Sequence, residues 1–148
     1  SEQARHILQM QRVAAQKKNI MLQFDTNGVD AEFLYDERYL RRVIANLLSN
    51  AIKFTQPGST VSVGLFESQG QIGFYEDDEG SGVPEAEQNI LFTEYGRTSV
   101  QSTGGEESTG LGLSICKKII EAHDGRIAMR NRKEGGARFF FHLPKLNK

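Results

Sequence analysis

The pattern of apolar and polar residues divides the chain into segments of helical and of extended character. Apolar residues recur at helical spacing in three long segments, and the middle one carries a broad stripe that includes Val43, Leu47 and Ala51. In the shorter segments apolar and polar residues alternate, which is typical of half-buried strands. The pattern predicts helices at 2–18, 37–54 and 111–122, a short helix from Pro84 to about Leu91, and strands at 20–25, 32–35, 60–67, 71–76, 126–131 and 137–143.

Turn-forming residues join several of these strands into hairpins. Ser68-Gln69-Gly70 and Glu134-Gly135-Gly136 each separate two alternating segments, and Pro57-Gly58 ends the central helix. The chain therefore contains strands that follow one another directly as hairpins, and it does not alternate strictly between one strand and one helix. This order predicts an α+β fold, a two-layer sandwich, and argues against a parallel βαβ array.

Length and composition limit the classes of function. The 148 residues form one domain of ordinary composition, and a net charge of −1 offers no electrostatic basis for contact with nucleic acid or a membrane surface. The chain has no signal peptide and no apolar run long enough to span a membrane. Its single cysteine, Cys116, falls on the apolar face of helix 111–122 and is expected to be buried. These features fit a reducing, cytoplasmic location, whether or not a longer parent chain is anchored in a membrane.

A glycine-rich segment, Ser108-Thr109-Gly110-Leu111-Gly112-Leu113-Ser114, runs directly into the helix at 111–122. The first N–H groups of a helix have no internal partner, and the helix dipole makes that end partly positive. Glycines allow an anion to approach those N–H groups closely. The segment therefore indicates a phosphate-binding site, although the same pattern also occurs in a plain tight turn.

The central helix carries polar residues beside its apolar stripe. Asn46, Asn50 and Lys53 lie at positions i, i+4 and i+7, on one face. Asparagine is a poor helix former, and its amide oxygen is a suitable ligand for Mg²⁺. A row of amides and one ammonium facing a polyphosphate and its cation explains this pattern, and a solvated polar edge is the alternative.

A second glycine loop, Asp78-x-Gly80-x-Gly82, follows the strand at 71–76. A carboxylate at this position can accept a hydrogen bond from the exocyclic amine of adenine, whereas guanine presents an acceptor at the equivalent place. Such a group could favour adenine by roughly 1–3 kcal/mol. An ordinary Asp-Gly turn is the alternative, and the acidic run 76–79 lacks the ligand spacing of a Ca²⁺ loop.

The order of these segments resembles the catalytic ATP-binding domain of sensor histidine kinases, within the ATPase superfamily shared with gyrase, Hsp90 and MutL. The resemblance covers about 33–144 and includes a segment at 91–97 similar to the family's phenylalanine box. It implies a Bergerat-type ATP-binding fold, in which a mixed, mostly antiparallel sheet of about five strands packs on three helices. It also implies that 1–18 ends a helical linker or dimerisation region and that 19–148 is the catalytic domain, with a lid at 96–109.

The resemblance assigns a role to each matching residue. Asn50 would bind Mg²⁺, Asp78 would accept the adenine amine, and Asn46, Lys53 and Arg97 would contact phosphates and serve catalysis. The other implied ATP contacts are Phe54, Gly80, Gly82, Val83, Thr109, Gly110, Leu111, Gly112, Leu113 and Phe139.

The implied function is to bind Mg²⁺–ATP and to donate its γ-phosphoryl group to a histidine on a dimerisation domain outside this chain, in two-component signalling. A downstream response-regulator receiver domain would be a further partner. ATP-hydrolysing members of the superfamily carry a general-base glutamate one turn before the metal-binding asparagine, where this chain has Asn46, which cannot take a proton from water. Poor hydrolysis is therefore expected. A degenerate nucleotide-sensing or partner-docking module and a stand-alone serine kinase or hydrolase are the alternatives.

The three histidines, His6, His123 and His142, lack the sequence surroundings of a phosphate acceptor, and His123 is expected to cap a helix end. Two residues depart from the family's pattern near Asp78. Glu76 stands where an apolar β-branched residue is usual, and Glu79 adds a negative charge beside the expected polyanion. Ala137 lies where a small hydroxyl is common. These departures predict weak or regulated nucleotide binding.

Overall fold

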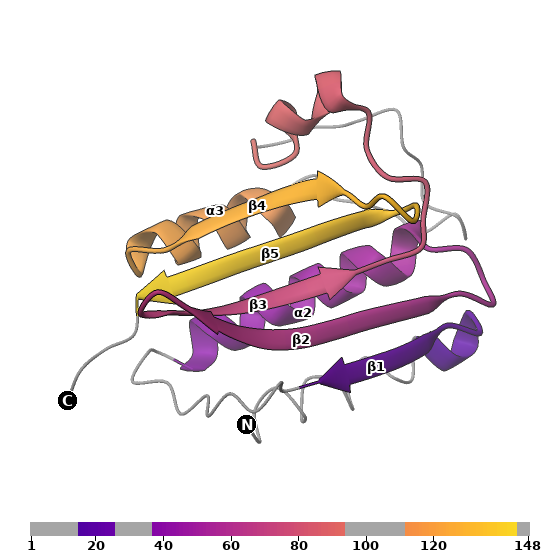
Figure 1. Cartoon of the computed structure of the whole chain (residues 1–148), viewed down its shortest axis with the longest axis horizontal. Helices are drawn as coiled ribbons and strands as arrows, with labels where there is room; N and C mark the ends of the chain where they lie inside the picture. The colour runs from indigo at the N-terminus through magenta and orange to yellow at the C-terminus, as the bar shows by residue number, and fades with distance from the viewer. Residues whose placement is uncertain (1–14, 26–36, 94–111, 145–148) are drawn as a thin grey trace.

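A five-stranded mixed sheet forms one layer of the protein (Figure 1). The structure, a computed structural model, describes residues 15–25, 37–93 and 112–144. β1 pairs with β2 in parallel, and the remaining neighbours pair antiparallel in the spatial order β1-β2-β3-β5-β4. The strands are β1 (Met21–Asp25), β2 (Thr60–Ser68), β3 (Gln71–Asp77), β4 (Arg126–Asn131) and β5 (Ala137–Pro144). The predicted α+β class and mostly antiparallel sheet are confirmed.

The two hairpins close where the sequence predicts them. Gln69 and Gly70, between β2 and β3, have φ angles of 51° and 75°. Gly135 and Gly136, between β4 and β5, have φ angles of 103° and 85°. Positive φ at both residues of the Gln69-Gly70 turn matches the right-handed twist of β2 and β3. The longer connection between β4 and β5 uses glycine at its two positive φ angles.

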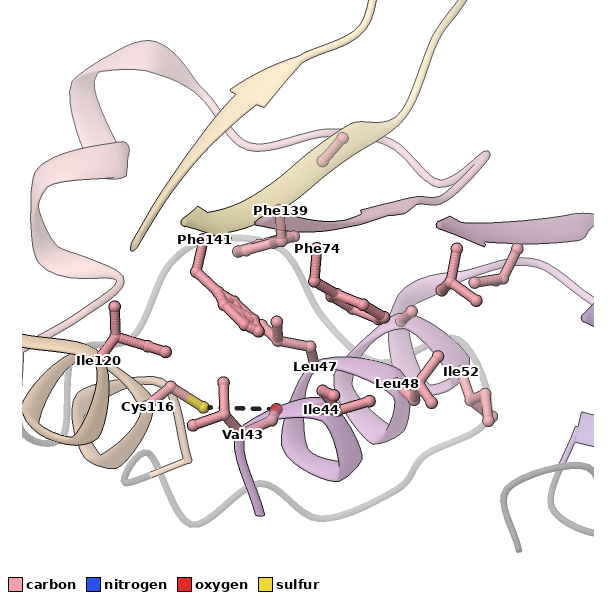
Figure 2. Packing of buried hydrophobic residues seen from close by; sticks show 14 of the residues in the cluster. Val43, Ile44, Leu47, Leu48, Ile52, Phe74, Cys116, Ile120, Phe139 and Phe141 are labelled. Carbon is pink, nitrogen blue, oxygen red and sulfur yellow. Dashed lines mark hydrogen bonds between the residues drawn. The ribbon is translucent and has the colours of Figure 1, made fainter. Parts of the chain in front are cut away.

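Two helices cover one face of the sheet. In α2 (Glu37–Phe54), the predicted stripe is completely buried at Val43, Leu47 and Leu48. Figure 2 shows this stripe packed against Phe74 of β3 and Phe141 of β5. α3 (Gly112–Ala122) lies beside α2 and contacts β4 and β5. Burial of this shared apolar surface is the main force that holds the helical layer on the sheet.

The structure confirms two smaller predictions on α3. Cys116 is fully buried against α2, with its Sγ 3.8 Å from the Val43 carbonyl oxygen, and burial raises the pKa of its thiol to about 11 (Figure 2). His123 lies beyond the last residue of α3, with Nδ1 2.7 Å from the Ile119 carbonyl oxygen. The imidazole N–H therefore satisfies a carbonyl that the helix leaves without a partner.

The opposite face of the sheet carries aromatic side chains over glycines. The Tyr75 ring covers Gly64 and the Phe66 ring covers Gly73, and each aromatic residue is paired in register with its glycine across β2 and β3. A Cβ atom on either glycine would overlap the ring. The open face is thus built from cross-strand pairs and has a different composition from the helix-covered core.

The structure has the short helix predicted after Pro84 and leaves other elements outside its described ranges. This helix is of the 3-10 type, η1 (Glu85–Ile90), and it buries no side chain. Of the helix predicted at 2–18, the structure describes residues 15–18, of which 15–17 are helical. The strand predicted at 32–35 and the lid predicted at 96–109 lie outside the described residues. No helix within the described ranges has the length and apolar character needed to cross a membrane.

Candidate nucleotide-binding site

Several helices and strands have one end at the same edge of the sheet, on the right in Figure 1. β3 and β4 end there, β5 begins there, and α2 ends shortly before β2 begins. α3 runs back along β4, so its first residues lie toward the same edge. The fold therefore gathers at this edge site residues that the sequence places far apart.

Asp78 directly follows β3 and is 5% exposed. Its Oδ1 atom accepts hydrogen bonds from the backbone N–H groups of Gly80 at 3.0 Å and Ala137 at 2.9 Å. Among the described residues no donor reaches Oδ2. Burial raises the pKa of Asp78, whereas the two N–H groups and the Arg132 guanidinium act to lower it, and Asp77 acts to raise it. The protein thus uses one carboxylate oxygen and leaves the other available to a ligand.

Gly80 allows the loop after β3 to lie against the last turn of α2. A Cβ atom on Gly80 would lie 2.7 Å from the Phe54 carbonyl oxygen and 3.3 Å from Asp78 Oδ1. A Cβ atom on Gly136 would collide with the Asp78 carbonyl oxygen on the other side. These close approaches bring Phe54, Gly80 and Asp78 together, as the sequence predicts for one site.

Two side chains that sequence reasoning missed hold this loop in place. Asn131 accepts a hydrogen bond from the Val83 N–H at 2.9 Å and donates one to the Val83 carbonyl at 2.8 Å. Arg132 Nη1 donates to the Asp78 carbonyl oxygen at 2.7 Å. Gly82, with φ +73°, packs directly against the Asn131 amide. The sequence gives no signal for these contacts, because a polar residue at a strand end is as often solvated.

The polar residues of α2 are half-buried, and they do not share one environment. Asn46 hydrogen-bonds the Cys116 thiol, a contact that opposes the stronger effect of burial on the pKa of that thiol. This amide therefore lies at the contact between α2 and α3. Asn50 and Lys53 follow one and two turns later, toward the end of α2 that approaches Asp78 through Phe54 and Gly80.

Lys18 caps the carboxyl end of α2. Its Nζ atom donates to the carbonyl oxygens of Ile52 at 2.7 Å and Lys53 at 2.9 Å. The last carbonyls of a helix lack internal partners, and a cation there also interacts favourably with the helix dipole. Sequence reasoning missed this contact, which ties the end of the predicted linker segment 1–18 to the turn that carries two predicted site residues.

The apolar side of the site is only partly described. Phe139 is 4% exposed, and the Phe92 ring packs edge-on against it with 6.4 Å between ring centroids. Gly112 opens α3, and a Cβ atom there would meet no protein atom within 4 Å, while Leu113 packs against the core. Four predicted site residues lie outside the described residues: Arg97, Thr109, Gly110 and Leu111.

The family follows from comparison with known proteins. The family model of histidine kinase-, DNA gyrase B- and HSP90-like ATPases matches residues 35–147. The chain belongs to this family. This histidine-kinase-type ATPase domain is 35% identical, over 139 residues, to the adaptive-response sensory kinase SasA of Synechocystis sp., covering 93% of the chain and 36% of the relative. The chain thus spans about a third of that kinase.

Solved structures agree with this assignment. Full-length ShkA in complex with AMPPNP aligns with a TM-score of 0.83 and 26% identity, covering 97% of this chain and 29% of ShkA. The histidine kinase ThkA in complex with the response regulator protein TrrA aligns with a TM-score of 0.80 and 28% identity, covering 98% of this chain and 40% of that one. The ATPase domain therefore has the fold of sensor histidine kinase catalytic domains.

Glu76 and Glu79, the two acidic departures in this ATPase domain, occupy different environments. Glu79 is exposed, and its Oε1 accepts a hydrogen bond from the Thr60 N–H at the start of β2. Glu76 is completely buried, and neither carboxyl oxygen has a hydrogen-bond partner among the described residues. Burial, followed by the charges of Asp78 and Asp77, raises the pKa of Glu76 well above its ordinary value, against the lowering effect of Arg132. Glu79 thus has a structural bond, whereas Glu76 has none.

Proposed function

We propose that this domain binds Mg²⁺–ATP and donates the γ-phosphoryl group to a histidine on a dimerisation domain outside the chain. The observation that carries the proposal is the Asp78 carboxylate, whose Oδ1 is held by two backbone N–H groups while Oδ2 has no partner among the described residues. The complex of ShkA with AMPPNP, an adenosine triphosphate analogue, supports an adenine nucleotide as ligand.

Adenine fits the free oxygen of Asp78 through its exocyclic amine. That amine is a hydrogen-bond donor, whereas guanine presents a carbonyl oxygen that would face the carboxylate lone pairs. A buried carboxylate left without a donor costs roughly 1–3 kcal/mol, which is enough to separate the two bases. Gly80, Gly82, Val83, Phe54 and Phe139 form the remainder of the proposed base site.

The amides of α2 fit the phosphate end of the nucleotide and its cation. Asn50 is half-buried, and an amide oxygen is a hard ligand of the kind Mg²⁺ accepts beside phosphate oxygens and water. When bound, Mg²⁺ would neutralise phosphate charge. We assign phosphate contacts to Asn46, Lys53 and Arg97, and to the start of α3 with the residues before it, 109–113.

Asn46, one helical turn before the proposed metal ligand, favours transfer of the phosphoryl group to another protein group over hydrolysis. Asn46 stands one turn before Asn50 on α2, and its amide cannot take a proton from water. Phosphoryl transfer depends mainly on positioning and on neutralising charge, so the domain needs no base of its own. The acceptor would reach the site on the separate dimerisation domain.

The proposed partners follow from the same comparison. The complex of ThkA with TrrA supports a response-regulator receiver domain as the downstream partner. The contact from Lys18 to the end of α2 supports residues 1–18 as the end of a linker from the dimerisation region, with 19–148 as the catalytic domain. A cytoplasmic location completes the proposal.

Asp78→Asn tests the base site. An asparagine Oδ1 can still accept the bonds from Gly80 and Ala137, so the loop is preserved while the free oxygen becomes an amide donor. We expect the ratio of ATP to GTP affinity to fall by about tenfold or more, measured by calorimetry. An unchanged ratio in a folded variant would exclude nucleobase recognition by Asp78. Absence of ATP binding by the wild type would favour a partner-docking module, the alternative that the extra carboxylates near the site support.

Asn50→Ala tests the metal site. We expect the variant to lose the gain in ATP affinity that Mg²⁺ confers on the wild type, because the proposed protein ligand is missing. Ser49→Ala, on the neighbouring position of α2, is the matched control and should keep that gain. If Mg²⁺ improves ATP affinity equally in all three proteins, Asn50 is not the ligand.

A further inference from the structure

Glu76 is a buried acid whose carboxyl group has no hydrogen-bond partner among the residues that the structure describes. It is 0% exposed, and among the described residues neither Oε atom has a hydrogen-bond partner. Alternation along β3 places it on the helix-covered face with Phe74 and Asp78. Its register partners are Val63 of β2 and Phe139 of β5, both core residues. An ionised carboxylate at this position would have apolar neighbours on both adjacent strands.

Few charged groups act on Glu76. Asp78 lies two residues along the same face, Asp77 points to the opposite face, and Arg132 lies beyond the end of β4. The helices packed on the sheet contribute Lys53, which is half-buried, and Cys116, which has a pKa of about 11. Further charged side chains on these helices are exposed: Arg41, Arg42, Lys117, Lys118 and Glu121.

We propose that Glu76 is a positioning residue for nucleobase recognition, held as a neutral carboxylic acid beside Asp78 so that Asp78 alone carries the negative charge. Ionising both of two buried carboxyl groups that lie two residues apart on one face costs more free energy than ionising one. Asp78 has two N–H donors and Arg132 close by, whereas Glu76 has no donor among the described residues, so a proton held by either of these two acids resides on Glu76. The inference rests on the proposed adenine site at Asp78.

Nucleotide binding should therefore be linked to a proton. A bound polyphosphate brings more negative charge to this edge of the sheet, which favours the neutral form of Glu76 further. Where Glu76 is ionised in the free protein, binding must take up a proton, and affinity falls as the pH rises. The slope has a limit of about tenfold per pH unit for one proton.

The experiment compares the wild type with Glu76→Gln, a permanently neutral side chain of similar shape. Affinity for Mg²⁺–ADP is measured by calorimetry from pH 6 to pH 9, in two buffers of different ionisation enthalpy. We expect affinity to fall at least about threefold more in the wild type than in the variant, with proton uptake in the wild type alone. Glu121→Gln, an exposed position on α3, is the control and should behave as the wild type.

The outcomes separate the two proposals. Equal pH slopes and equal proton uptake in the wild type and Glu76→Gln, with nucleotide bound by both and with the same pH dependence of urea unfolding in the two proteins, would overturn the role of Glu76 and leave the proposed function intact. Failure of the wild type to bind ADP at any pH would overturn both. If Glu76→Gln does not fold, urea unfolding of Glu76→Leu decides: a free energy of unfolding that decreases above pH 5 more in the wild type than in this variant supports a neutral Glu76, and equal profiles refute it.

Discussion

Two adjacent acidic residues of β3, Glu76 and Asp77, face opposite sides of the sheet, and the protein accommodates their carboxyl groups in different ways. Asp77 lies on the open face, where the Arg138 guanidinium holds both carboxylate oxygens, at 2.6 Å and 2.7 Å. The same guanidinium lies 4.6 Å from the centroid of the Tyr75 ring. Glu76 lies on the core face and has no partner among the described residues.

The difference shows that a face of the sheet decides how an acid is accommodated. On the open face the long cationic side chain of Arg138 binds both carboxylate oxygens of Asp77. On the core face no cation among the described residues pairs with Glu76, and retaining the proton costs less free energy than ionising there. Residues 76–79 are all acidic, yet each has a different environment. Glu76 lies in the core, Asp77 forms an ion pair, Asp78 binds backbone N–H groups of a loop, and Glu79 is exposed.

The largest expected effect comes from removing the buried acid. Glu76→Leu replaces a carboxyl group by an apolar side chain of similar volume, and we expect it to raise the free energy of unfolding at pH 8 by about 1–3 kcal/mol. Because burial raises the pKa of Glu76 in the folded state, its contribution is fully present below the ordinary value of 4.5 and is lost as pH rises through the folded pKa. The variant should lack this decline.

Urea unfolding between pH 4 and pH 9 measures the effect, with Glu121→Leu, at an exposed position of α3, as a control for added apolar surface. A Glu76→Leu protein that is less stable than the wild type at pH 8, with the same pH dependence, would show that Glu76 is ionised and stabilised by groups that the structure does not reveal.

The sequence predicted the fold well because local signals there agree with the tertiary structure. The stripe on α2, the glycine turns and the strand alternation each reflect burial that the folded protein preserves, as at Leu47 and Gly70. Contacts that depend on distant chain segments could not be read in this way. Lys18 reaches Ile52 across 34 positions, and Asn131 reaches Val83 across 48. Polar residues of this kind carry no periodic signal, so spacing alone does not reveal their partners.

In the candidate site, too, local motifs could be read from the sequence and contacts with distant segments could not. Asp78 and Gly80 belong to a spaced motif and Phe54 ends a helix, and the structure places the three close together. Alternation would also place Glu76 on the core face, but the sequence alone does not say whether a partner waits there. The roles assigned to Arg97 and to 109–111 stay predictions, because these residues lie outside the described ranges.

A smaller effect is expected from breaking the ion pair on the open face. In a double-mutant cycle of Asp77→Asn and Arg138→Met, we expect a coupling free energy of about 1 kcal/mol. The bidentate geometry strengthens the pair, but the Arg138 side chain is 33% exposed and solvent weakens it. Arg130→Met, on the neighbouring strand in register with Arg138, is the control and should show no coupling to Asp77→Asn. A coupling as large as the effect of Glu76→Leu would mean that the two faces do not differ as proposed.

The smallest effect on stability, and the sharpest test of the comparison, is expected from Arg132→Met. This change removes the hydrogen bond to the Asp78 carbonyl oxygen, for about 0.5–1 kcal/mol at low pH. It also removes the positive charge that lowers the pKa of both Glu76 and Asp78, so both pKa values should rise further. The pH-dependent decline in stability should therefore extend to higher pH than in the wild type, as seen by urea unfolding across the same range. Lys133→Met, an exposed neighbour, should leave the profile unchanged. If Arg132→Met lowers stability equally at every pH, Arg132 acts only through its hydrogen bond to the loop. The pKa difference between Glu76 and Asp78 must then come from the backbone N–H groups that bind Asp78.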